Sequence, residues 1–324
     1  EGNYETIDQR LADTLPVNMD VDLVLAKLYG LYAEAGYKLR KKDRKRYADL
    51  AAEFYQANGL YVNSAKILWA YHEYCRDEWL DWEESYHTLE RIRNEYKGNG
   101  LEEDTVFQLK LLLDEAIDLM ALEEYTTAHQ KLKCAIKLAN KTNIYYQMDN
   151  IYRIAANEAL RNNDGEEYLR LLKKSEQYAV FTENEASIKV MPLLRAMYHN
   201  MIKYEHASAM AELEQYSAEG MFLDPLYHLE MGRTLFGLGR IEEALISLSQ
   251  VKLVDYLIHP IDIAMLQSAG IYRALCYEQM GREEEALKEI DHAEKQLRRM
   301  PKSIYYQHAV KVKKRLAEKK GTDD

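Results

Sequence analysis

Apolar residues recur at spacings of three and four along most of the chain, which is typical of amphipathic helices. The clearest stretch is 231–297, because it contains two copies of one unit, 42 residues apart. Each copy has a small residue, a large residue three positions on, a Gly turn, and then a small and a large residue four apart. This pattern predicts consecutive helix pairs. The first copy carries Gly232, Leu235, Gly239, Ala244 and Leu248, and the second carries Ala274, Tyr277, Gly281, Ala286 and Ile290.

The small residue that opens each unit serves as an anchor that can be followed through the rest of the chain. Pro192 is expected in the first turn of its helix, where the missing N–H costs little. Met300 and Pro301 end the last pair, and a single helix with a basic end follows as the cap that a solenoid end requires. Seven helix pairs, about 40 residues apart, are predicted from anchors near positions 36, 75, 116, 156, 195, 232 and 274.

The segments GLGRIEEALISL and QMGREEEALKEI resemble the turn and second helix of the tetratricopeptide-repeat (TPR) family. Spacing alone would favour HEAT or armadillo units, which run to about 40–47 residues against about 34 for TPR, but the small residues inside each unit favour TPR. The resemblance implies an all-α fold, a right-handed superhelical solenoid of about seven TPR-like helix pairs with a C-terminal capping helix. It also implies a lead-in over 1–20, the repeat domain over 21–301, and the capping helix and tail over 302–324.

Composition indicates an ordered helical chain. Hydrophobic residues make up 47% and charged residues 30% of the 324, with only five Pro. No apolar run reaches the roughly 18 residues of a membrane span, and the N-terminus does not open a secretory signal. The three Cys, at 75, 134 and 276, predict neither a disulfide framework nor a zinc site. We therefore expect a cytoplasmic protein without membrane contact and, since position 1 is Glu, a segment removed upstream.

The formal net charge of −11 argues against general nucleic-acid binding, which needs a basic face. Two basic runs, at 38–46 and 311–320, are expected to be solvated helix ends, with an interaction surface as the alternative. The three Trp lie close together, at 69, 79 and 82. Clustered aromatics at helical spacing favour an inter-helix core over a ligand cage.

A polar row on one predicted helix is the strongest functional signal. Counted from an anchor residue, the TPR resemblance places groove-facing positions one residue after it and three and six before it. For the anchor Ala156 these positions hold Asn157, Arg153 and Asn150. A carboxamide can donate to and accept from a peptide backbone, and an arginine can hold a carboxylate by two parallel bonds. The alternative is that this row is only the solvent-exposed face of a surface helix.

Neighbouring pairs hold further candidate peptide-binding residues at the corresponding positions or one residue from them. They are Lys110 and Asp114 in the third pair, Glu230 and Arg233 in the sixth, and Tyr272 in the seventh. A groove of mixed charge with Asn and Arg at its middle suits a short peptide. The nine His form no metalloprotease, triad or Cys-His signature, and no Gly-rich phosphate loop is present. We therefore expect no enzyme, no metal and no cofactor.

Together these features resemble the cytoplasmic peptide-pheromone receptors of Gram-positive bacteria and their phages. In that group the solenoid often follows an N-terminal DNA-binding helix-turn-helix and switches when a short imported peptide binds. The resemblance implies the ligand-sensing domain of a peptide-responsive regulator, with a short peptide or protein segment in the groove, no direct nucleic-acid binding by this segment, and a homodimer as an option. The alternatives are a constitutive scaffold or co-chaperone-type adaptor, and the regulatory solenoid of a larger multidomain protein.

Overall fold

The computed structural model describes residues 3–15, 22–101, 103–216, 224–252 and 260–323, and within these ranges all regular structure is helical. The chain divides into two compact units, unit 1 over residues 1–122 and unit 2 over residues 123–324. The boundary falls in the turn between the two helices that the sequence pattern assigns to the third pair. Part of the expected lead-in over 1–20 and the last residue of the expected tail lie outside the described residues.

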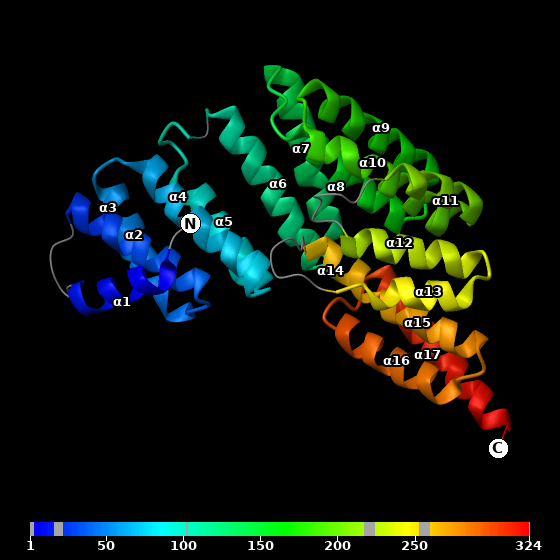
Figure 1. The fold of residues 1–324 in the computed structure, drawn as a ribbon. Helices are drawn as coiled ribbons and strands as arrows, with labels where there is room; N and C mark the ends of the chain where they lie inside the picture. The colour runs from blue at the N-terminus through cyan, green and yellow to red at the C-terminus, as the bar shows by residue number, and fades with distance from the viewer. Residues whose placement is uncertain (1–2, 16–21, 102, 217–223, 253–259, 324) are drawn as a thin grey trace. The chain divides into compact units, whose positions relative to one another are not determined.

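Unit 1 is a series of helices in which each one packs on the next (Figure 1). Its elements are α1 (Tyr4–Thr14), α2 (Leu23–Lys38), the short η1 (Lys42–Arg44), α3 (Lys45–Ala57), α4 (Tyr61–Glu73), the π-helical η2 (Tyr74–Glu78), α5 (Trp82–Glu95) and α6 (Thr105–Ala121). Contacts run from α1 to α2, α2 to α3, α3 to α4, α4 to α5 and α5 to α6. Helices that are neighbours in the sequence are therefore also neighbours in space within this unit.

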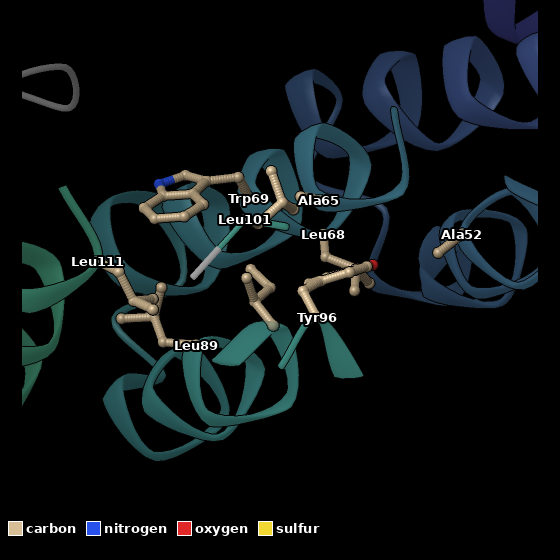
Figure 2. Close-up of a cluster of buried hydrophobic side chains, with 9 residues drawn as sticks. Ala52, Ala65, Leu68, Trp69, Leu89, Tyr96, Leu101 and Leu111 are labelled. Carbon is tan, nitrogen blue, oxygen red and sulfur yellow. The ribbon is translucent and has the colours of Figure 1, made fainter. Parts of the chain in front are cut away.

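Aromatic and aliphatic side chains fill the core between these helices (Figure 2). Trp69 of α4 packs with Leu89 of α5 and Leu111 of α6, and the two Leu are fully buried. Trp69 and Trp82 are each only 6% exposed. Trp79 packs against the rings of Tyr37 and Tyr71, at centroid distances of 5.6 and 6.0 Å. The expectation of an inter-helix core is therefore confirmed for Trp69 and Trp79.

The basic run at 38–46 makes contacts inside unit 1. Lys41 and Arg44 both pair with the buried Asp8 of α1. The guanidinium carbon of Arg44 also lies 4.3 Å from the ring centroid of Tyr32. Lys41 and Arg44 therefore attach α1 to the rest of unit 1 through Asp8.

Unit 2 continues the packing of each helix on its neighbours (Figure 1). Its elements are α7 (Tyr125–Thr142), α8 (Met148–Arg161), α9 (Gly165–Phe181), α10 (Glu185–Tyr198), the π-helical η3 (His199–Lys203), α11 (His206–Gln215), α12 (Asp224–Gly237), α13 (Ile241–Ser249), α14 (Pro260–Gln267), α15 (Ala269–Gln279), α16 (Glu283–Leu297) and α17 (Ile304–Asp323). The pairs α8 with α9, α10 with α11, α12 with α13 and α15 with α16 are joined by contacts between successive pairs, and α17 packs on α16. The expected all-α architecture of neighbouring helix pairs is confirmed.

The repeat signature marks the place where two paired helices touch. A Cβ atom built on Gly232 of α12 would lie 2.4 Å from Cγ of Leu248 in α13, which is closer than two carbon atoms can approach. The missing side chain therefore allows the two helices to come together. In the second copy Ala274, Ala286 and Ile290 are fully buried at the corresponding positions.

Pro192 lies in the middle of α10 and not in its first turn, so that expectation is wrong. The helix begins at Glu185, because Asn184 caps it by accepting a hydrogen bond from the backbone N–H of Ser187 at 3.3 Å. Proline has no N–H to donate to the carbonyl of Ile188, so α10 lacks one backbone hydrogen bond at this point. The N-cap, and not the proline, sets the start of the helix.

We expect Gly232→Val to lower the free energy of unfolding by about 1–3 kcal/mol, because a branched side chain at this position overlaps Leu248. Denaturant unfolding followed by circular dichroism measures the loss. Adding Leu248→Ala makes room, so the double variant should be more stable than the sum of the two single changes predicts. Strictly additive losses would show that the close approach does not limit packing here.

Candidate functional site

A pocket of about 320 Å³ lies in unit 2 among four helices, α8, α10, α12 and α14. The first three of these helices alternate along the chain with α9, α11 and α13. Polar side chains face the pocket mainly from α8, and apolar side chains face it mainly from α10. The lining residues are Asn150, Arg153 and Asn157 of α8, Asn184 before α10, Ala186, Ser187, Val190, Leu193, Leu194 and Met197 of α10, Leu226 and Glu230 of α12, and Asp262 and Met265 of α14.

Helical spacing places the predicted polar row of α8 on the pocket side. Asn150, Arg153 and Asn157 are half-buried, whereas Ile151 and Ala155 are buried. Arg153 Nη2 donates to Asn150 Oδ1 at 3.3 Å. Among the described residues, Arg153 makes no ion pair within 4 Å and the Asn157 carboxamide makes no hydrogen bond. Both side chains line the pocket and would meet a molecule bound in it.

Asp149 joins two walls of the pocket. Its Oδ2 atom accepts hydrogen bonds from Asn184 Nδ2 at 2.8 Å and from Ser187 Oγ at 2.6 Å, both at the start of α10. Its backbone carbonyl accepts from Ser175 Oγ of α9 at 2.8 Å. Since Asp149 is buried, these bonds form in a low-dielectric environment where they are strong. They fix α8 against α9 and α10.

The apolar wall on α10 follows the same positions as the polar row on α8. If the fully buried Ala196 is taken as the anchor of α10, then Met197, Leu193 and Val190 lie one residue after it and three and six before it. The sequence pattern placed this anchor near 195, one residue too early, and so missed all three. The available signal was that Ala196 stands 40 residues after Ala156.

Glu230 lines the pocket, but its two oxygens are already engaged. Oε1 accepts from Arg233 Nη1 at 2.5 Å, and Oε2 accepts from Asn200 Nδ2 at 3.0 Å. Arg233 is only 2% exposed, and its guanidinium carbon lies 5.1 Å from the ring centroid of Tyr272. The predicted residues Arg233 and Tyr272 therefore stand behind Glu230 and support the pocket wall.

Asp262 of α14 is an acidic pocket residue that sequence analysis missed. Burial raises its pKa to about 6, and the positive charge of Arg153, which lines the same pocket, opposes this rise. Asp262 lies twelve residues before the anchor Ala274, beyond the positions that the repeat template covers. The template fails there because the first helix of the seventh pair is broken into α14 and α15.

The other two predicted residues, Lys110 and Asp114, lie in unit 1, on α6. Lys110 Nζ lies 4.5 Å from the ring centroid of Trp69 and 3.4 Å from Glu73 Oε1, at a second pocket of about 320 Å³ that α4 and α6 line. Asp114 is buried, and it accepts hydrogen bonds from Trp69 Nε1 at 3.0 Å and from Arg76 Nη1 at 2.9 Å. Its carboxylate therefore supports the core of unit 1.

A Ser, a His and an Asp of unit 1 also lie within hydrogen-bonding distance of one another. Ser85 Oγ donates to Asp118 Oδ2 at 2.7 Å and lies 2.8 Å from His72 Nδ1. All three residues are fully buried, so no substrate reaches the hydroxyl. Burial raises the pKa of Asp118 well above its usual range, and burial together with the charge of Arg76 holds the pKa of His72 well below its own. This cluster joins α4, α5 and α6 and is not an accessible nucleophile.

Neither a scan against protein-family models nor a search of curated proteins finds a match to this chain. Among the helices of the described ranges, none combines the length and the apolar character that crossing a membrane requires. The TPR resemblance therefore rests on the repeat spacing and the paired helices.

We expect Asp114→Ala to lower the free energy of unfolding by about 2–4 kcal/mol, because it leaves two buried donors, Trp69 Nε1 and Arg76 Nη1, without their acceptor, while Arg76 keeps its ion pair with Asp77. Lys110→Ala on the same helix should cost less than about 1 kcal/mol, since its ion pair with Glu73 is largely solvated. Denaturant unfolding of both variants gives the comparison. Equal losses would contradict the assignment of Asp114 to the core.

The raised pKa of Asp262 predicts a pH-dependent stability. The unfolded chain ionises this carboxyl near its usual value of 3.8, whereas the folded chain holds the proton up to about pH 6. The wild type therefore loses stability as pH rises from about 4 to about 6. Asp262→Asn cannot ionise, so its free energy of unfolding should rise relative to wild type over this range and then level off.

Unfolding curves at pH 4, 5, 6 and 7 measure this trend. Glu214→Gln, at an exposed position of α11 outside the pocket, is the matched control. A difference between Asp262→Asn and wild type that does not change with pH would rule out a buried, ionising Asp262.

Proposed function

We propose that unit 2 binds an extended peptide or protein segment in the pocket of α8, α10, α12 and α14. The observation that carries this proposal is the shared register of alternating helices. Counted from a buried small residue, the same three positions of α8 and of α10 face one pocket. On α8 they hold Asn150, Arg153 and Asn157. This is the arrangement that the TPR resemblance implies for a concave ligand groove.

The two sides of the pocket suit the two parts of a peptide. The carboxamides of Asn150 and Asn157 can pair with backbone N–H and C=O groups, and Arg153 can hold a carboxylate by two bonds. The apolar wall around Leu193 can receive a side chain, whose full burial contributes about 1.5–3 kcal/mol for a residue the size of Leu. On this proposal the apolar wall provides much of the affinity and the polar row orients the backbone.

The helix pairs, on the same proposal, form a right-handed TPR-like solenoid that is the non-enzymatic, ligand-sensing part of a cytoplasmic peptide-responsive regulator. The neighbour-to-neighbour packing of the pairs supports the solenoid. The cysteines support a reducing compartment, since Cys75, Cys134 and Cys276 are all free. A constitutive adaptor or the regulatory solenoid of a larger protein would use the same pocket. These alternatives differ from the regulator in their partner or in whether binding changes the conformation.

A phage-displayed library of short unstructured peptides, selected on the wild-type protein, supplies a ligand for calorimetry. Asn150→Ala combined with Asn157→Ala should raise the Kd of a selected peptide about 30-fold or more, because each lost carboxamide leaves peptide groups unpaired at about 1–3 kcal/mol. Asn140→Ala, at an exposed position of α7, is the control and should leave the Kd unchanged.

Circular dichroism confirms that each variant is folded before its affinity is compared. Peptides that bind the double variant as tightly as wild type would place the binding site outside this pocket. A selection that yields no specific peptide at all would favour an adaptor whose partner is a folded protein.

A further inference from the structure

The break between α14 and α15 is built around the side chain of one residue, Ser268. Its backbone N–H donates to the carbonyls of Ala264 and Met265, both at 3.1 Å, and its Oγ atom donates to the Met265 carbonyl at 2.5 Å. In a continuous helix the Met265 carbonyl would accept from the N–H of Ala269. The hydroxyl takes part of that role, and a side chain that competes for a helical carbonyl bends or interrupts a helix. α14 and α15 are therefore separate helices that meet at a one-residue turn, in which Ser268 itself keeps right-handed helical dihedral angles.

Arg233 holds this break from the neighbouring helix α12. Its Nη2 donates to Ser268 Oγ at 2.6 Å, while its Nη1 donates to Glu230 Oε1 at 2.5 Å. The guanidinium carbon lies 5.1 Å and 5.7 Å from the ring centroids of Tyr272 and Tyr305. Because Arg233 is almost fully buried, these contacts are shielded from water and fix the guanidinium in one place.

The two helices that Arg233 connects, α12 and α14, line different walls of the pocket. Glu230 lines it from α12, and Asp262 and Met265 line it from α14, one to two turns before Ser268. A single guanidinium thus joins a wall residue of α12 to the point where α14 changes direction. α14 also packs on α15, α16 and α17, and Met265 is only 4% exposed, so this bridge is the polar part of the contacts that hold α14 over the pocket.

We propose that Arg233 and Ser268 are positioning residues. Their hydrogen bond, which we call the latch, holds α14 against the pocket, and the turn at Ser268 is the hinge about which α14 can move. When the bond is absent, α14 swings about the Ser268 break and the pocket opens on the side of Met265. Neither residue touches the bound segment. The inference rests on the proposed function only for what enters the pocket, since the hinge and its latch are properties of the free protein.

The test measures how often Met265 becomes accessible without any ligand. Met265→Cys introduces a thiol on the inner face of α14, and its rate of alkylation by iodoacetamide is followed by peptide mass spectrometry. The native thiols provide internal controls, because Cys134 is exposed and Cys276 is fully buried in α15. Adding Ser268→Ala should raise the labelling rate at position 265 about tenfold and leave the rates at Cys134 and Cys276 unchanged.

Three further variants, each in the Met265→Cys background, separate a latch from a general loss of packing. Arg233→Lys keeps the charge but not the planar fork that reaches both Glu230 and Ser268, so it should raise the rate as Ser268→Ala does. Ser268→Thr keeps the hydroxyl and should label as slowly as the parent. Ser247→Ala on α13 removes a buried hydroxyl that donates to the His228 carbonyl at 3.0 Å, and it should also have no effect.

An unchanged rate in Ser268→Ala would overturn the latch. So would an equal increase in Ser247→Ala, or a parallel increase at Cys276, because either would indicate loosening of the whole unit. Peptide selection plays no part in these measurements. A failure to find a peptide therefore leaves the latch standing, and a failed latch leaves peptide binding to be judged by the Asn150 and Asn157 variants.

Discussion

The close approach of paired helices at a small residue is the constraint on which the rest of this structure depends. Gly232 leaves no room for a Cβ atom beside Leu248, and a Cβ atom on Gly36 would lie 2.0 Å from Cγ of Arg44. Each first helix must therefore turn its small residue towards its partner, which fixes its rotation about its own axis. That rotation decides which positions face away from the partner. In unit 2 these positions face the pocket, so a packing requirement determines which side chains a ligand meets.

The same constraint explains how far the sequence was informative. The helix pairs and the row of Asn150, Arg153 and Asn157 follow from correctly placed anchors. In α10 the anchor was placed one residue early, and one residue corresponds to about 100° of rotation in a helix. Counted from position 195, the template would turn the groove-facing side of α10 away from the pocket, and no residue of its apolar wall was predicted. The prediction was limited by the rotation assigned to each helix about its own axis, and not by the assignment of residues to helices.

The sequence also did not reveal how deeply each candidate side chain is buried. A position rule gives the direction of a side chain on its helix, but it does not say what covers that side chain. Trp69 and Arg76 cover Asp114, and the rings of Tyr272 and Tyr305 cover Arg233. Each of these partners lies more than 30 residues away in the sequence. Such partners are set by tertiary packing. The same holds for Asp262, which lines the pocket from α14, before the turn at Ser268.

The contrast between satisfied and unsatisfied polar groups bears on the two interpretations of the α8 row. Two deep carboxylates beside the pocket, Asp149 and Glu230, each accept hydrogen bonds from two side-chain donors. Arg153 and Asn157 are half-buried beside an apolar wall, yet they lack comparable partners among the described residues. Neither side chain is fully buried, so water in the pocket can hydrate both in the free protein. A ligand that displaces this water has to offer hydrogen bonds in its place. The peptide proposed for this pocket meets that requirement, because its backbone would pair with these groups while one of its side chains covers Leu193.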